Sequence, residues 1–356
     1  MRMSRYILPA ILCGILVTSC KPDTETIYIE LDVLTPYELV IPKGFPPMDI
    51  PADNQMTVQG VALGRKLFYD ERLSGDNTQA CATCHLASSS FSDPDRFSTG
   101  IDGSVGDRNA MAIVNLGWVG NTGFFWDGRA LTLEEQALGP VTNPIEMNAT
   151  WPDVLVKLNA DEVYRNEFKI AFGVNEIDSL DVAKALAQFE RTLISGNSRF
   201  DQFFNDSLQL TDSEFRGFQL FGSEDADCFH CHGTKLTMGF ENVNNGLQQT
   251  MVDFGVGGVT GNAQDIGKFK APTLRNIAVS GPYMHDGRFN TLEEVIEFYN
   301  SGVNQNSPNI APEMKKNNRP GGSLHLSPQQ KEDLLAFLNA LTDQEFLSNP
   351  EFQNPN

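Results

Sequence analysis

Hydrophobic residues recur every three or four positions in several segments of this chain, which is the spacing that gathers them on one face of an α-helix. Two segments also open with helix-capping residues: Thr211 stands three residues before Glu214, and Ser327 stands three residues before Gln330. Strand-like alternation is scarce, so a mainly helical fold is expected. The segments predicted to be helical are residues 59–72, 180–194, 211–221 and 327–341.

Two stretches lack this periodicity and are expected to lie outside the helices. Residues 21–51 are rich in proline and are predicted to form a tether followed by an arm that wraps around the folded part. Residues 242–268 are rich in Gly, Asn and Gln and are predicted to form a long loop. The expected architecture is therefore a set of helices joined by long connections.

The N-terminus has the pattern of an export signal. Arg2 and Arg5 precede an apolar stretch at residues 7–17, which is too short to span a bilayer. The stretch leads to Val-Thr-Ser before Cys20, which resembles a bacterial lipobox. Residues 1–20 are therefore predicted to be a lipoprotein signal peptide, with cleavage before Cys20 and a lipid on its thiol that tethers the protein to a membrane. The alternative is an ordinary signal peptide with an incidental cysteine. Both predict an exported protein of the periplasm or cell envelope.

The chain is strongly acidic, with a formal net charge of −20 over 356 residues. Nucleic acid is not expected as a partner, because its phosphates would be repelled. Such a field could steer a basic electron-transfer protein toward the surface, although solubility alone accounts for an acidic surface equally well. The length suffices for two domains of ordinary size.

Two pentapeptides of the form Cys-x-x-Cys-His stand at residues 81–85 and 228–232. This form is the attachment signature of c-type haem: two thiols one helical turn apart bond the porphyrin, and the histidine ligates its iron. A zinc site would need four ligands in one place, and a redox dithiol would need a βαβ context that is not visible here. Two covalent haems are therefore expected, held by Cys81, Cys84, His85, Cys228, Cys231 and His232.

A second self-similarity follows the motifs. Residues 126–135 recur with few changes as residues 285–294, and both copies contain an Asp-Gly-Arg turn and a Thr-x-x-Glu helix start. The simplest account is one haem-binding unit used twice, as two tandem cytochrome c-like domains with long loops. The predicted boundaries are residues 52–205 for the N-terminal domain, 206–345 for the C-terminal domain and 346–356 for a tail.

Together these residues resemble the bacterial dihaem cytochrome c peroxidase family, which includes the methylamine-utilisation dihaem oxidases. The resemblance runs from about residue 60 to residue 341 and is most specific at residues 125–129 and 271–276. It implies that the N-terminal haem reduces hydrogen peroxide and that the C-terminal haem passes electrons to it. It also implies that Trp126 relays electrons between the haems, although the residue could equally be a plain core aromatic.

Peroxide reduction needs a group beside the open iron face that moves a proton from the near oxygen to the far one. The resemblance implies that Glu146 is this acid/base and that Gln136 orients the peroxide. Without the family spacing from Trp126, the two would be read as a surface carboxylate and a solvent-facing helix residue.

The resemblance also implies one calcium ion between the haems. Its ligands would be Asn109, which follows an arginine, and the backbone carbonyls of Ser280 and Pro282. Oxygen ligands suit a hard cation such as calcium.

The histidines bear on the coordination of the first haem. The chain has five histidines, and residues 86–109 contain none. Many members of the family have a distal histidine in this stretch that must leave before peroxide binds. The N-terminal haem is therefore expected to be five-coordinate without reductive activation, as in the methylamine-utilisation branch. His230, a variable position inside the second motif, is expected to be a spectator.

The sixth ligand of the C-terminal haem is predicted to be Tyr299, which stands fourteen residues beyond His285 at the family's axial position. A core tyrosine is the alternative, with Met284 and Met314 as rival ligands. Methionine raises a haem's potential, whereas an anionic tyrosinate favours oxidised iron.

The expected function is a dihaem c-type peroxidase that reduces hydrogen peroxide to water. Its electrons would come from a small redox protein, such as a monohaem cytochrome c or a cupredoxin. One alternative is a peroxide-dependent oxidase of a protein or small molecule. The other is a non-enzymatic dihaem electron carrier, which would need both irons fully ligated. The oligomeric state is left open, with a homodimer as one option.

Overall fold

The computed structural model describes residues 33–315 and 322–355, and the chain from Leu34 onward forms one compact unit. The expected signal peptide, Cys20 and the first part of the tether lie outside the described residues. Within the described ranges, no helix is both long and apolar enough to cross a membrane.

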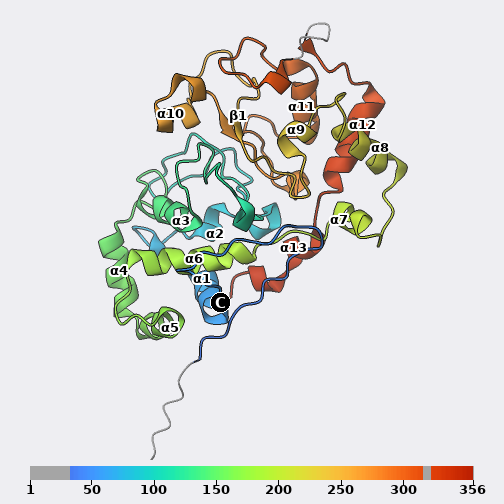
Figure 1. Ribbon diagram of the computed structural model, residues 1–356. Coiled ribbons are helices and arrows are strands. Elements are labelled where there is room, and N and C mark those ends of the chain that lie inside the picture. Colours follow the sequence, from blue (N-terminus) through green and yellow to red (C-terminus); the bar gives the residue numbers. More distant parts are fainter. Residues whose placement is uncertain (1–32, 316–321, 356) are drawn as a thin grey trace, which may run out of the picture. The chain divides into compact units, whose positions relative to one another are not determined.

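The structure is mainly helical, as expected (Figure 1). The α-helices are α1 (Val58–Phe68), α2 (Cys81–Cys84), α3 (Leu133–Thr142), α4 (Trp151–Ala160), α5 (Glu162–Phe172), α6 (Ser179–Thr192), α7 (Arg199–Phe204), α8 (Asp212–Phe221), α9 (Phe229–His232), α10 (Val256–Thr260), α11 (Leu292–Glu297), α12 (Pro328–Asn339) and α13 (Gln344–Ser348). Two short antiparallel strands, β1 (Asn242–Val243) and β2 (Phe269–Lys270), pair Asn242 with Lys270. Short 3-10 turns cover residues 71–73, 87–89, 116–118, 263–265, 277–279, 312–314 and 350–352, and a π-turn covers residues 298–302.

The four helices predicted from hydrophobic spacing are all present, as α1, α6, α8 and α12. The capping boxes at Thr211 and Ser327 are confirmed, since each side chain accepts a hydrogen bond from the third residue of its helix. The first helix is shorter than expected and ends at Phe68. The reason lies in Asp70, whose side chain accepts from the backbone N–H of Arg72 and begins a separate turn.

The stretch 242–268 is not wholly a loop. It contains β1 and the short helix α10, which the Gly-rich composition did not indicate. Gly255 directly precedes α10. Glycine is needed there, because its φ of +54° is one that other residues rarely adopt and a Cβ would lie 2.2 Å from the carbonyl oxygen of Lys268.

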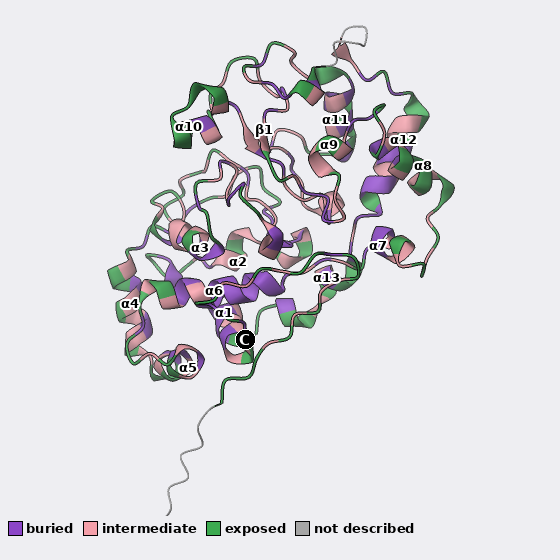
Figure 2. Ribbon diagram, viewed as in Figure 1, coloured by how far each residue is buried: buried purple, intermediate pink, exposed green. Residues whose placement is uncertain are grey.

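Two helix crossings share the same construction. A Cβ on Gly64 of α1 would lie 1.9 Å from the carbonyl oxygen of Ala185 in α6, and a Cβ on Gly217 of α8 would lie 1.9 Å from that of Asp333 in α12. Only glycine lets the two helices of each pair approach this closely. Each crossing packs near one Cys-x-x-Cys-His motif: Cys81 packs against one hydrophobic cluster and Cys228 against another. α6 is buried along most of its length (Figure 2).

Candidate haem sites

The first motif forms the short helix α2, which His85 terminates. The ring Nδ1 of His85 lies 2.7 Å from the carbonyl oxygen of Phe91. A carbonyl only accepts, so Nδ1 carries the proton and Nε2 keeps its lone pair. Burial lowers the pKa of His85, which keeps the ring neutral. A neutral imidazole whose outer nitrogen is held by a carbonyl is the usual form of an iron ligand.

The second motif repeats this geometry on α9. The ring Nδ1 of His232 lies 3.1 Å from the carbonyl oxygen of Thr237, and burial lowers the pKa of His232 to about 4. The thiols of Cys228 and Cys231 form no disulfide, and burial raises the pKa of both. Buried thiols that are not bridged to each other are available for thioether bonds to a porphyrin.

A cavity of about 240 Å³ opens beside the second motif, and apolar side chains form most of its wall. A single water needs roughly 15 Å³, so the cavity suits a much larger apolar group. Cys228, Cys231 and His232 all line it. The residues present therefore fit a covalently attached haem, which Cys228, Cys231 and His232 would hold.

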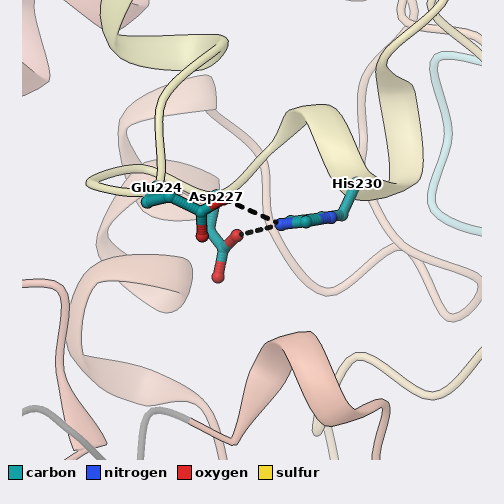
Figure 3. A group of neighbouring side chains, drawn as sticks. All are labelled: Glu224, Asp227 and His230. Atoms are coloured by element: carbon teal, nitrogen blue, oxygen red, sulfur yellow. Dashed lines mark ion pairs between the residues drawn. The ribbon is translucent and has the colours of Figure 1, made fainter.

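His230, inside the second motif, takes part in a separate group (Figure 3). Its Nε2 lies 3.0 Å from an oxygen of Asp227 and 3.6 Å from an oxygen of Glu224. Both carboxylates are thus within ion-pairing distance of the ring, and the role of His230 as a spectator of the iron stays a prediction. The three residues could hold a metal ion, although Glu224 is largely exposed.

Glu146 lies near the first motif, since its charge raises the pKa of both Cys81 and Cys84, after burial as the main cause. Its own pKa is raised by burial, against two opposing influences. These are a 2.6 Å hydrogen bond from the Asn143 amide and the positive charge of Arg129. A half-buried carboxyl with a raised pKa can both hold and release a proton. Gln136 is half-buried on α3.

Trp126 lines the cavity of the second motif, and its ring lies edge-on to His285 with centroids 6.4 Å apart. Its indole N–H donates to the carbonyl oxygen of Asn109 at 2.8 Å. Three residues further on, Arg129 acts electrostatically on Glu146. This short segment therefore runs from the cavity beside the second motif to Glu146, the acid/base expected at the first haem.

The three residues expected to bind calcium line one cavity together with Trp126: they are Asn109, Ser280 and Pro282. The backbone N–H of Asn109 donates to the carbonyl oxygen of His285 at 2.8 Å, which links the two halves of the chain here. Their amide and carbonyl oxygens are of the kind that a hard cation prefers, and calcium binding here stays a prediction.

All three candidate axial ligands of the second haem line the same cavity: Tyr299, Met284 and Met314. The side-chain amide of Asn245 donates to the Tyr299 hydroxyl at 3.2 Å. Burial raises the pKa of Tyr299 to about 12, although the Asn245 hydrogen bond lowers it. The cavity thus leaves the choice of ligand open.

Sequence reasoning missed several polar side chains around these sites. Arg108 pairs with Asp127 at 2.6 Å and with Asp253 at 2.7 Å. Asp253 comes from the stretch predicted as a loop, and no local signal marked it. Glu190 is buried at the end of α6, and the only signal was its place among apolar residues on a helix.

The chain is similar to known proteins over most of its length. Residues 58–209 match the family described as di-haem cytochrome c peroxidase. The methylamine utilization protein MauG of Methylorubrum extorquens is 37% identical over 306 residues, covering 82% of this chain and 80% of that protein. Cytochrome-c peroxidase IdrP1 of Pseudomonas sp. (strain SCT) is 32% identical over 330 residues, covering 83% of this chain and 84% of that protein. The chain belongs to the di-haem cytochrome c peroxidase family.

A solved structure agrees with this membership. A MauG-like protein associated with microbial copper homeostasis superimposes with a TM-score of 0.82 at 34% identity, covering 90% of this chain and 99% of that one. The family and the mainly helical fold expected from the sequence are thus confirmed. As a di-haem cytochrome c peroxidase family member with relatives named as cytochrome-c peroxidases, the chain is an oxidoreductase, and its family implies two c-type haems.

Proposed function

We propose that this protein is an exported dihaem peroxidase that converts hydrogen peroxide, two electrons and two protons into two waters. Electrons from a small redox protein, such as a monohaem cytochrome c or a cupredoxin, enter at the C-terminal haem and pass to the N-terminal haem. The haem at residues 81–85, when bound, supplies the iron that takes up peroxide. The lipid on Cys20, the calcium ion and the two tandem haem domains are parts of the same proposal.

The observation that carries this proposal is the position of Glu146. Its carboxyl is held by Asn143 beside the first motif, where burial raises its pKa. Glu146 takes a proton from the near oxygen of peroxide and delivers it to the far oxygen, which then leaves as water. Gln136 orients the peroxide beside this carboxyl.

Trp126 is the proposed relay for electrons. Its indole is fixed by the hydrogen bond to Asn109, so the ring keeps one orientation in the wall of the cavity beside the second motif. The segment that it begins reaches Arg129, whose charge acts on Glu146. Electron entry and proton transfer are thereby connected by four consecutive residues.

A second candidate function is a peroxide-dependent oxidase, as in the MauG relatives. Tyr299 favours it, because this residue lines the cavity beside the second motif, where a tyrosinate ligand would favour oxidised iron. The lack of histidine in residues 86–109 agrees with this branch too.

Turnover of the purified holoprotein separates these functions. With peroxide and a reduced cytochrome or cupredoxin, the proposal expects oxidation of two one-electron donors for each peroxide consumed. Two haem masses on the polypeptide with no donor oxidation, but with oxidation of a protein or small-molecule substrate, would favour the oxidase. Loss of all peroxide consumption would contradict both.

A further inference from the structure

Glu190 is a carboxylic acid in the interior of the protein. It is 4% exposed, and its Oε2 accepts no hydrogen bond within the described residues. Its neighbour Arg191 is already paired with Glu134 at 2.8 Å, and Glu134 also accepts from Asn54. The buried cation is thus neutralised by another carboxylate. A carboxylate left this way in the interior is costly unless it is protonated or meets another positive charge.

The two similar helix crossings can be aligned with each other residue by residue. The position of Gly64 lies against the Ala185 carbonyl and Phe189 of α6, and that of Gly217 lies against the Asp333 carbonyl and Phe337 of α12. The offset within each pair is four residues, so the two crossings have the same register.

One residue beyond these phenylalanines, Glu190 therefore corresponds to Leu338. Leu338 lines the cavity of the second haem site together with Cys228. By this correspondence, Glu190 would stand at the first haem site in the place that leucine takes at the second.

A separate observation places the carboxyl at the same site. The pKa of Cys81 is raised first by burial and next by the charge of Glu190, which is the strongest charged influence on that thiol. The first haem would be bonded to Cys81. Glu190 thus lies near the thiol that would attach the first haem.

We propose that Glu190 exchanges a proton with solvent in step with the oxidation state of the N-terminal haem. When this haem gains one electron from the C-terminal haem, the Glu190 carboxylate gains one proton, and both are given up together on reoxidation. The cause is electrostatic: reduction removes one positive charge from the iron, and a buried carboxylate at the same site is then less well stabilised. This inference rests on the proposed function, because it requires a haem at residues 81–85.

Other charged groups share this region and define the test. Arg191 and Glu134 pair with each other, and they respectively lower and raise the pKa of Glu190, which burial brings to about 8. Glu146 also acts on Cys81 and has a raised pKa. The porphyrin's own propionates titrate as well. A test must therefore compare variants of Glu190 that leave Glu146 and Glu134 in place.

The experiment is a spectroelectrochemical titration of both haems in the holoprotein, from about pH 5 to about pH 9. The variants are Glu190→Gln, which keeps the size and shape of the side chain, and Glu190→Leu, which introduces the residue type found at the corresponding position of the second site, Leu338. In the wild type, the potential of the N-terminal haem should fall as pH rises. The limit is a tenfold shift in the equilibrium for each pH unit, about 59 mV for one electron. Both variants should lose most of this slope, and the slope of the C-terminal haem should be the same in all three proteins.

An equal slope of the N-terminal haem in the wild type and in either variant would overturn the inference. So would a wild-type slope no steeper than that of the C-terminal haem. If both variants lacked the first haem, Glu190 would be a structural residue, and the inference would also be wrong. Failure of the proposed function would appear separately, as wild-type protein without two haems or without peroxide turnover.

Discussion

Replacement of Glu146 by glutamine separates proton transfer from the shape of the first haem site. The glutamine side chain has the same size, and its carbonyl oxygen can still accept the 2.6 Å hydrogen bond from Asn143. The change therefore removes one titratable proton and one negative charge while the local geometry is kept.

The expected loss can be worked from the role of the group. A positioned acid/base contributes about a hundredfold to ten-thousandfold in rate, which is roughly 2.7 to 5.4 kcal/mol of transition-state stabilisation at about 1.36 kcal/mol per factor of ten. Stability should change in the other direction. Because burial raises the pKa of Glu146 in the folded state, the carboxyl binds more protons folded than unfolded. It therefore costs stability as pH rises above its ordinary range, and glutamine removes that cost.

The assay is steady-state peroxide reduction with a reduced donor, measured across pH for the wild type, Glu146→Gln and a control. Glu176→Gln is a suitable control, because Glu176 is an exposed carboxylate in another part of the chain. We expect turnover to fall a hundredfold or more in Glu146→Gln, with both haem spectra preserved and a melting temperature at neutral pH that is equal to or above that of the wild type. The part of the pH profile that reports deprotonation of this carboxyl should disappear with it.

Near-normal turnover in a correctly loaded Glu146→Gln protein would refute the reasoning and assign the proton transfer to another group. A loss of haem binding in this variant would instead show that Glu146 is a structural residue. A matching loss in Glu176→Gln would show that the assay responds to surface charge.

Further predictions concern the haems, the crossings and the cation. If Tyr299 is the axial ligand, Tyr299→Phe should change the low-spin signal and potential of the C-terminal haem, and Met314→Leu should not; a methionine-to-iron band lost only in Met314→Leu would contradict this. Gly64→Ala and Gly217→Ala should each lower the free energy of unfolding by about 1 to 3 kcal/mol, measured by denaturant titration. Gly106→Ala should change it little, because a Cβ there meets nothing closer than 3.8 Å; equal effects at all three positions would argue against tight crossings. Chelation of calcium should slow electron transfer between the haems, and Asn109→Ala should reproduce the effect; unchanged single-turnover kinetics in both would remove calcium from the site.

Four of the helices, α1, α6, α8 and α12, and both haem motifs could be predicted because their signals are local. Thr211 with Glu214 and Ser327 with Gln330 fix helix starts within one turn of chain, and the structure contains both caps. The end of α1 was missed by a few residues, because Asp70 begins a competing turn.

The surroundings of the sites could not be predicted, because tertiary packing creates them. The three candidate axial ligands, Tyr299, Met284 and Met314, are separated along the chain, yet all of them line one cavity. No sequence rule could therefore choose among them. The proposed role of Glu190 could not be predicted either, because it depends on the correspondence between Glu190 and Leu338 in the two helix pairs.

The central claim is that the N-terminal haem is an open peroxide site in the protein as isolated. The direct measurement is a titration of the fully oxidised holoprotein with hydrogen peroxide, without prior reduction. It is followed by optical absorption and by electron paramagnetic resonance. We predict a high-spin signal from one haem, absent when Cys81 and Cys84 are replaced by serine, that disappears with about one equivalent of peroxide per protein. A purely low-spin spectrum that responds to peroxide only after one-electron reduction would contradict the account.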